Sequence, residues 1–304
     1  MLKVIFLGTG GSVPSPNRGM PSLMVVREGE RMLFDCGEGT QRQMMIARSG
    51  FMDIHSIFLS HFHADHTLGI PGLIQTMGFQ GRTEPLHIYG PKFVEEYCEI
   101  LDALGYLKPA FDVVAHELKH GDVVERKDYR IEAFRTFHSV PSLGYALRED
   151  KRPGRFDRQR AINMGVPEGP LFGKLHKGEN VTLNGKEIKS ADIVGEPRPG
   201  RLIVYSGDTT PSHTFLSMLE GADLWISEAT FADKAADKAA ETLHSSSGDV
   251  ARLAAMAGVQ QLVLTHISSR YSEDISPLLE DASKHFPNVM VAEDLMEVEI
   301  PLKD

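Results

Sequence analysis

The segment HFHADH (residues 61–66) holds three histidines and one aspartate within six positions, directly after the apolar run Ile57–Leu59. Imidazole and carboxylate groups are the side chains with which proteins hold zinc when few cysteines are present. A single histidine after a core strand is usually structural, whereas four such groups at one strand end favour a metal centre. The segment therefore predicts a metal site, whose remaining ligands must come from elsewhere in the chain.

The composition is that of a globular protein. The chain has 304 residues, of which 41% are hydrophobic and 24% charged, enough for one large α/β domain or two smaller ones. No stretch approaches the roughly 18 apolar residues of a membrane span. The apolar start MLKVIFLGTG is too short for a secretory signal and reads as a first strand. We therefore expect a cytoplasmic protein without a membrane partner.

Cysteine content and net charge exclude several kinds of site and of binding partner. The two cysteines, Cys36 and Cys98, exclude a disulfide framework and are too few for a thiolate zinc site. The formal net charge of -10 argues against a non-specific nucleic-acid binder, and no DNA partner is expected. Residues 148–177, however, carry eight Lys or Arg against four acids, so this segment is basic within an acidic chain.

Apolar runs alternate with stretches of helical spacing, which indicates sheets packed against helices. Strands are predicted at residues 3–7, 22–26, 32–34, 56–59, 86–89, 131–137, 202–205, 224–226 and 262–264, and helices at 41–48, 91–104, 212–219, 246–257 and 277–286. Residues 149–178 break this pattern, because they are rich in Gly, Pro and Arg. They read either as a disordered loop or, given the apolar GPLFGKL (169–175), as an ordered insertion.

Three further metal ligands follow predicted strands. His138, Asp208 and His266 each come at or shortly after the end of an apolar run. Loops at strand ends converge in α/β folds, so seven candidate ligands are expected to meet at one edge. They are His61, His63, Asp65, His66, His138, Asp208 and His266.

The stretch LSHFHADHTLGIPGL (59–73) resembles the His-x-His-x-Asp-His signature of the metallo-β-lactamase superfamily. More narrowly, the chain resembles the short form of the ribonuclease Z family, the tRNA 3′-processing endonucleases. The supporting stretches are FLGTGGSVPSPNRGMPS (6–22), FDCGEGTQRQ (34–43), GPLFGKL (169–175), YSGDT (205–209), SEATF (227–231), LHSSSGD (243–249) and THISSRY (265–271). The resemblance implies an αββα sandwich and a single catalytic domain over residues 1–304.

The resemblance also implies a ligand allotment with two Zn²⁺ ions per subunit. One ion would be held by His61, His63 and His138, the other by Asp65, His66 and His266, with Asp208 bridging the two. Imidazole-rich ligands favour zinc, although Mn²⁺ or Fe²⁺ can occupy similar sites.

The implied reaction is hydrolysis of the phosphodiester after the discriminator nucleotide of precursor tRNA, leaving a tRNA 3′-hydroxyl and a 5′-phosphorylated trailer. Asp65 would be a ligand, a general base or both, and Glu228 with His244 would form the proton donor for the leaving group. The family's usual His-Ser-Thr motif is His244-Ser245-Ser246 here, which retains a hydroxyl. Without the resemblance, Glu228 reads as an ordinary exposed acid at a strand end.

Other residues receive supporting roles. Asp35 would accept a hydrogen bond from a metal-binding imidazole, or else cap a turn. Ser268 and Arg270 would contact the scissile phosphate, with a surface salt bridge as the alternative for Arg270. Arg18 matches the family loop Pro-x-Lys-x-Arg-Asn, which senses nucleotides beyond the discriminator. The Lys and Asn positions of that loop hold Pro16 and Gly19 here, which puts discrimination against CCA ends in doubt.

In this family a flexible arm grips the tRNA elbow in trans, which implies a homodimer. The arm is expected at about 149–178, and the candidate tRNA contacts are Gly169, Pro170, Lys174, Arg152 and Arg155. The alternatives are a metal-dependent phosphodiesterase or small-ester hydrolase on the same fold, and an RNA-binding protein whose metals serve only the fold. The basic segment disfavours the first pair, because small substrates do not need it, and the complete ligand set disfavours the last.

Overall fold

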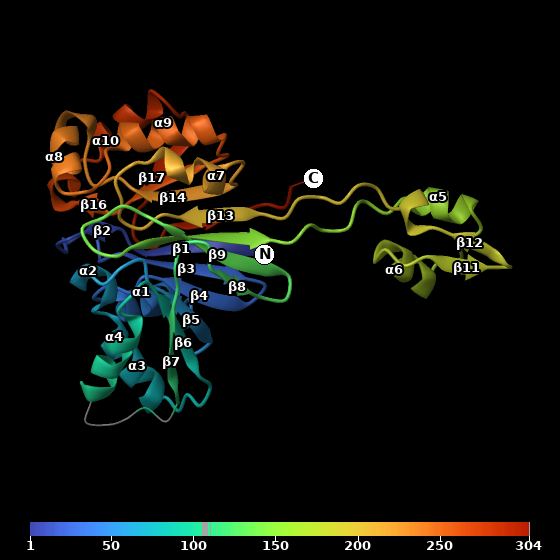
Figure 1. The fold of residues 1–304 in the computed structure, drawn as a ribbon, viewed down its shortest axis with the longest axis horizontal. Coiled ribbons are helices and arrows are strands. Elements are labelled where there is room, and N and C mark those ends of the chain that lie inside the picture. The colour runs from blue at the N-terminus through green and yellow to red at the C-terminus, as the bar shows by residue number, and fades with distance from the viewer. Residues whose placement is uncertain (105–108, 110, 304) are drawn as a thin grey trace. The chain divides into compact units, whose positions relative to one another are not determined.

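The structure is a computed structural model that describes residues 1–104, 109 and 111–303 (Figure 1). The chain forms two compact units. The first comprises Met1–Glu125, Ile131–Leu147 and Leu202–Pro301, and the second comprises Arg126–Arg130, Arg148–Arg201 and the C-terminal residues from Leu302. No helix in the described part of the chain is long and apolar enough to cross a membrane.

Two mixed sheets form the first unit. One has the strand order β18 (Glu297–Glu299), β1 (Leu2–Gly8), β3 (Ser22–Arg27), β4 (Glu30–Phe34), β5 (Ile54–Phe58), β6 (Leu86–Gly90) and β7 (Val113–Glu117). The other has the order β17 (Val289–Val291), β15 (Leu262–Thr265), β14 (Leu224–Glu228), β13 (Leu202–Tyr205), β10 (Leu143–Glu149), β9 (Tyr129–Arg135) and β8 (Val123–Glu125). A short parallel pair joins β2 (Gly10–Gly11) to β16 (Ile267–Ser268).

Helices cover the outer face of each sheet in Figure 1, which gives the expected αββα layers. The first sheet is covered by α1 (Thr40–Ala47), α3 (Ile70–Phe79) and α4 (Val94–Ala103), with the short α2 (Ala64–Thr67) at the end of β5. The second is covered by α7 (Leu216–Leu219), α9 (Ser247–Ala257) and α10 (Ser276–Ser283), with α8 (Ala236–Glu241) alongside.

Successive side chains of a strand point to opposite faces of the sheet, so the two faces pack against different parts of the protein. Leu33 and Ile57 belong to the apolar cluster that the first sheet shares with its helices. Their neighbours Phe34 and Phe58 point the other way and stack with ring centroids 5.2 Å apart. Phe34 also meets Tyr145 of β10, at 5.8 Å between centroids. Because side chains of a strand alternate between faces, this aromatic layer fills the space between the two sheets and sets how the sheets pack on each other.

The second unit has a small core of its own. It contains α5 (Arg158–Asn163), α6 (Pro170–His176) and the antiparallel hairpin of β11 (Val181–Leu183) and β12 (Lys186–Ile188). Its buried apolar residues are Ala161, Val166, Leu175, Val181, Ile188 and Ile193. The basic segment at 149–178 is therefore ordered, and it belongs to a unit that continues to Arg201.

Several elements differ from the sequence prediction. The strand expected to reach residue 137 ends at Arg135, and the helix expected at 212–219 divides into the 3-10 turn His213–Phe215 and α7. The strand β10 and the helix α3 were not predicted. The α3 sequence IPGLIQTMGF contains a proline and two glycines, which usually argue against a helix. The proline is tolerated here because it lies in the first turn of the helix.

Candidate metal centre and active site

The candidate ligands lie where four strands of the two sheets end. His61, His63, Asp65 and His66 occupy the connection from β5 into α2. His138 lies three residues beyond β9, Asp208 three beyond β13, and His266 follows β15 directly; the structure brings these side chains into one cluster. The convergence expected from strand ends is therefore present in the first unit.

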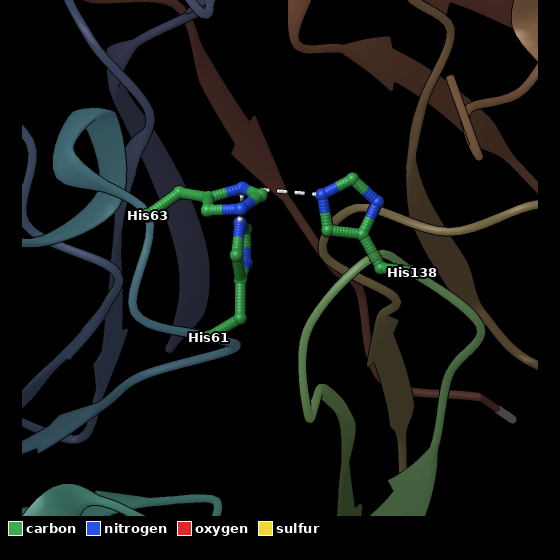
Figure 2. A group of neighbouring side chains, drawn as sticks. All are labelled: His61, His63 and His138. Atoms are coloured by element: carbon green, nitrogen blue, oxygen red, sulfur yellow. Dashed lines mark hydrogen bonds between the residues drawn. The ribbon is translucent and has the colours of Figure 1, made fainter.

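His61, His63 and His138 form one group of ligand atoms, drawn in Figure 2. Nδ1 of His63 lies 3.0 Å from Nε2 of His61 and 3.2 Å from Nε2 of His138. The other ring nitrogens of His61 and His138 contact residues outside the group. Nδ1 of His61 faces the Ser60 hydroxyl at 3.0 Å, and Nδ1 of His138 faces the Leu243 carbonyl at 2.9 Å. The three inward nitrogens are thus presented together, which is the arrangement a shared cation requires.

Asp65, His66 and His266 form a second group, and Asp208 lies beside both groups. Oδ2 of Asp65 is 3.6 Å from Nε2 of His66 and 3.5 Å from Nε2 of His266. Oδ2 of Asp208 is 3.0 Å from Nε2 of His266, 3.4 Å from Nε2 of His66 and 3.9 Å from Nε2 of His61. Asp208 is therefore placed to contact a cation in either group.

The chemistry of the donors fits a metal. Among the described residues, Nε2 of His66, Nε2 of His266 and Oδ1 of Asp208 are buried and make no hydrogen bond of good geometry, although Nε2 of His266 lies close to Oδ2 of Asp208. Buried polar atoms are normally satisfied, so three unsatisfied atoms in one cluster indicate that the cluster binds a cation. Imidazole nitrogens and carboxylate oxygens suit zinc.

Electrostatics within the cluster follow from burial and from the carboxylates. Burial alone would lower the pKa of His266, but Asp208 and Asp65 raise it to about 10. The pKa of His66 is likewise raised against the effect of burial, by Asp208 and Asp35. Burial and the neighbouring imidazoles instead lower the pKa of His61. Protons and metal ions compete for these nitrogens, so metal binding would release protons from His66 and His266.

Local backbone geometry keeps the ligands in place. Asp35 and His266 adopt left-handed conformations, with φ of 57° and 56°, which cost free energy in residues other than glycine. Gly207 also has a positive φ of 57°, and a Cβ there would lie 2.6 Å from Cβ of Ser60. A side chain at position 207 would therefore push Asp208 away from the loop that carries His61.

Asp35 supports the metal site from behind. It is fully buried, and its Oδ2 lies 2.8 Å from Nδ1 of His66, so this imidazole presents Nε2 to the cluster. The same carboxylate accepts hydrogen bonds from the Ser60 amide at 2.7 Å, the Ser60 hydroxyl at 2.8 Å and the Tyr205 hydroxyl at 2.6 Å. The sequence indicated Asp35 but not Ser60 or Tyr205, although Tyr205 opens the stretch YSGDT.

Tyr205→Phe tests this support. Removing the hydroxyl leaves the buried carboxylate short of one donor, so we expect zinc affinity to fall by roughly 10- to 100-fold, as for other outer-shell partners of metal-binding histidines. Competition with a chromogenic chelator measures the affinity. Tyr145→Phe is the matched control, because its buried hydroxyl donates to the Leu59 carbonyl at 2.6 Å instead. Equal loss of zinc affinity in both variants would contradict the assignment.

Glu228 and His244 form a hydrogen-bonded pair beside the ligands. Glu228 is buried, contrary to its reading from sequence as an exposed acid, and its Oε1 lies 2.8 Å from Nδ1 of His244. Its Oε2 accepts hydrogen bonds from the Thr230 hydroxyl at 2.6 Å and the Ser245 amide at 3.1 Å. Burial opposes the charged imidazole, but the charge and hydrogen bond of Glu228 prevail and raise the pKa of His244.

The third residue of the His244-Ser245-Ser246 motif has a structural role. The Ser246 hydroxyl accepts a hydrogen bond from the Asp249 amide at 3.3 Å and caps the N-terminus of α9. Serine and threonine both cap helices in this way, so the departure from the family motif leaves this contact intact.

The residues predicted to contact the substrate lie in different surroundings. Arg270 is exposed, with its guanidinium carbon 5.0 Å from the centre of the Phe231 ring, and Ser268 is half-buried in β16. Arg18 is buried, and its Nη1 donates to the Thr9 hydroxyl at 2.7 Å and to the Ala292 carbonyl at 2.6 Å. This geometry favours a role for Arg18 in anchoring its loop rather than in touching substrate.

The candidate tRNA contacts lie in the second unit. The helix α6 begins at Pro170, directly after Gly169, which has a φ of 134°, and Lys174 is exposed on the same helix. Arg152 donates a hydrogen bond to the Lys303 carbonyl, and the Arg155 carbonyl accepts one from the Gly195 amide. Lys174 and Arg155 are exposed, whereas Arg152 is half-buried. Sequence reasoning on charge alone did not separate the half-buried Arg152 from these two exposed residues.

These layers and this histidine–aspartate centre define a protein of the metallo-β-lactamase fold. Among solved structures, the metallo-β-lactamase fold protein YhfI from Bacillus subtilis matches with a TM-score of 0.70 at 20% identity, over 98% of each chain. The short form of human tRNase Z matches with a TM-score of 0.72 at 29% identity, over 99% of this chain and 100% of the human one.

Sequence relatives define the family. The chain is 57% identical to ribonuclease Z from Methanosarcina acetivorans, over 100% of this chain and 99% of the relative. It is 48% identical to ribonuclease Z from Haloferax volcanii, over 100% of this chain and 96% of the relative. The chain belongs to the ribonuclease Z family, the endonucleases of tRNA 3′ processing. A family model described as anti-Pycsar protein Apyc1 also matches residues 2–152, which exclude Asp208, Glu228, His244 and His266.

Proposed function

We propose that this chain removes the 3′ trailer of precursor tRNA by hydrolysing the phosphodiester after the discriminator nucleotide, leaving a tRNA 3′-hydroxyl and a 5′-phosphorylated trailer. The observation that carries the proposal is the convergence of seven metal-type ligands beside a buried carboxylate–imidazole pair. A metal centre alone suits many hydrolyses, but an adjacent proton donor suits a reaction that expels a strongly basic alkoxide.

The ligand geometry supports two divalent ions per subunit. His61, His63 and His138 would hold one ion and Asp65, His66 and His266 the other, with Asp208 between them. Zinc suits this donor set best, and Mn²⁺ or Fe²⁺ would suit it less well. Bound there, such ions would make a water molecule more acidic and neutralise charge on the phosphoryl oxygens.

The protein's own groups complete the reaction. His244, held through Nδ1 by Glu228, would give its Nε2 proton to the departing ribose 3′-oxygen. Asp65, whose Oδ2 already accepts the Ser12 amide at 2.8 Å, would serve as ligand and take up the proton of the attacking water. Arg270 and Ser268 would contact the scissile phosphate.

Analysis of product ends tests the proposal. A precursor tRNA should yield a tRNA that accepts ligation at its 3′-hydroxyl and a trailer whose 5′-phosphate is removed by phosphatase. A 2′,3′-cyclic phosphate on the tRNA would contradict it, because the nucleophile would then be the ribose 2′-hydroxyl rather than water. Hydrolysis of small esters without any cut in precursor tRNA would favour the small-substrate alternative.

The second unit supports recognition of tRNA. Lys174 and Lys177 are exposed on and just after α6, and phosphate contacts give affinity without reading sequence. For Lys174→Glu/Lys177→Glu we expect kcat/KM for precursor tRNA to fall relative to that for a small phosphodiester. The salt dependence of RNA binding should also weaken, by about 0.7 to 0.9 in the log–log slope for each phosphate that the variant no longer binds.

A charge-matched control separates this effect from net charge. Lys234→Glu/Lys238→Glu changes two exposed lysines near α8 in the first unit, and it should leave the ratio unchanged. Equal losses on both substrates in the α6 variant would refute a role in tRNA binding. If the second unit acts in trans, as the family resemblance implies, the native protein is a homodimer, and sedimentation equilibrium would give twice the chain mass.

A further inference from the structure

A basic pocket opens beside His138 in the first unit, with a volume of about 680 Å³. Its walls come from the segment after β6, the segment after β7, and the end of β9 with the loop that follows it. The residues used below are Lys92, Lys119, His120, Arg135, His138 and Leu243. This size is typical of sites that hold a nucleotide-sized group.

The pocket has an unusual charge for this protein. Lys92, Lys119 and Arg135 contribute three cations, His120 adds an imidazole, and none of the residues that line the pocket is acidic. The chain as a whole carries -10. Nζ of Lys119 lies 3.4 Å from Oε1 of Glu117, but the Lys119 side chain is 78% exposed. This ion pair is therefore weak, and the ammonium group stays accessible to a ligand. A concave surface with one sign of charge attracts the opposite sign, here a polyanion.

Two residues connect the pocket with the reacting centre. His138 belongs both to the pocket wall and to the first group of metal ligands. Leu243 lines the pocket, its carbonyl lies 2.9 Å from Nδ1 of His138, and it directly precedes His244. The pocket therefore lies next to the side of the centre that carries the proton donor.

The position of the pocket beside the proton donor indicates which half of the substrate would enter it. In the proposed reaction the group protonated by His244 is the 3′-oxygen of the discriminator nucleotide, and the chain leads from there into the 5′ part of the tRNA. The trailer keeps the phosphate and leaves on the other side of the scissile bond. RNA on the leaving-group side would run past Leu243 and His138 toward the cations.

We infer that the basic pocket binds the RNA on the 5′ side of the cut, with Lys92, Lys119 and Arg135 holding the phosphates of the discriminator nucleotide and its 5′ neighbour. This inference rests on the proposed function. Arg135 is exposed, and one face of its guanidinium lies over the Phe137 ring at 5.5 Å, which leaves the N–H edge for a phosphate and the other face for a base. Phosphate contacts of this kind position the RNA without reading its sequence.

Competition by the two product halves tests the inference. The probes are a short acceptor-stem hairpin that ends in the discriminator 3′-hydroxyl, and a 5′-phosphorylated trailer oligonucleotide. The hairpin lacks the tRNA elbow, so contacts made by the second unit to the elbow do not contribute. For Arg135→Ala and Lys119→Ala we expect the inhibition constant of the hairpin to rise about 10-fold while that of the trailer stays within about twofold. Lys238→Ala is the control and should change neither.

The outcomes separate this inference from the proposed function. Weaker trailer binding with unchanged hairpin binding would place the pocket on the wrong side of the cut and overturn the inference. Unchanged binding of both halves, in variants whose zinc content equals that of the original protein, would also overturn it. Failure of the unaltered protein to cut precursor tRNA would instead refute the proposed function.

Discussion

Asp208→Asn is expected to abolish precursor cleavage and to empty both metal positions. Asp208 is the carboxylate that lies beside both ligand groups, 3.0 Å from His266 and 3.9 Å from His61. An amide keeps the shape but removes the negative charge that two cations would share. We expect cleavage to fall by about 10³-fold or more, equivalent to ~4 kcal/mol of transition-state stabilisation. Metal analysis by plasma mass spectrometry and single-turnover cleavage measure the two effects.

The control for this variant is Asp237→Asn, which changes an exposed aspartate on α8 by the same atoms. It should retain full zinc content and full activity. A second comparison, His63→Ala against the exposed His55→Ala, tests the first ligand group in the same way. Normal zinc content and near-normal cleavage in Asp208→Asn would show that the ligand assignment is wrong.

His244→Ala is expected to lose roughly 10²- to 10⁴-fold in the rate of precursor cleavage, the usual contribution of a general acid. The loss should be far smaller on bis(p-nitrophenyl) phosphate, because p-nitrophenolate is a weak base that departs without a proton. A ribose 3′-alkoxide is a strong base and needs one. Comparing single-turnover rates on the two substrates therefore isolates proton donation from binding and from metal chemistry.

Zinc content distinguishes the donor role of His244 from a ligand role. His244 also lies close enough to His138 and Asp208 to share a cation with them. If it is the donor, His244→Ala keeps its zinc, and so does the exposed control His213→Ala. Loss of zinc, or equal rate losses on both phosphodiesters, would make His244 a ligand instead. Glu228→Gln should show the same substrate dependence with a smaller loss, because the imidazole remains but is less well held.

The clustering of the candidate ligands was predictable, because the segments that carry them follow apolar runs. His266 comes directly after β15, and Asp208 follows β13 by three residues, so local sequence was sufficient to place them at one edge of the fold. The sandwich and the pairing of ligands with particular metals came from family resemblance. The structure shows the sandwich and brings the ligands together, while the number of zinc ions stays a prediction.

Contacts between the sheets were not predictable. Tyr205 reaches Asp35 across 170 positions in the sequence, and this contact depends on how the aromatic layer packs.

The burial of individual polar residues was not predictable either. Glu228 read as exposed because acids at strand ends usually are, yet Thr230 and Ser245 supply the donors that make its burial tolerable. The burial of Arg18 and its hydrogen bonds to Thr9 and Ala292 were not predictable, because the loop motif carries no information on burial. Residues 149–178 remained ambiguous because their small core includes Val181, Ile188 and Ile193 beyond that segment.

The family model of the anti-Pycsar protein Apyc1 matches less of the chain than the ribonuclease Z relatives do. The matched residues 2–152 include the candidate ligands up to His138 but not Glu228 and His244. The full-length match to ribonuclease Z relatives includes these residues and the second unit. A reaction confined to small phosphodiesters would give neither feature a role.

Metal-dependent cleavage of one precursor tRNA is the decisive test of the proposed activity. The substrate is labelled at its 3′ trailer and incubated with the purified protein, with the protein after chelation, and with the chelated protein after zinc is returned. We predict a single cut after the discriminator nucleotide that disappears with the metal and returns with about two zinc ions per chain. Cleavage that persists without metal, or RNA binding without any cut by the zinc-loaded protein, would contradict this prediction.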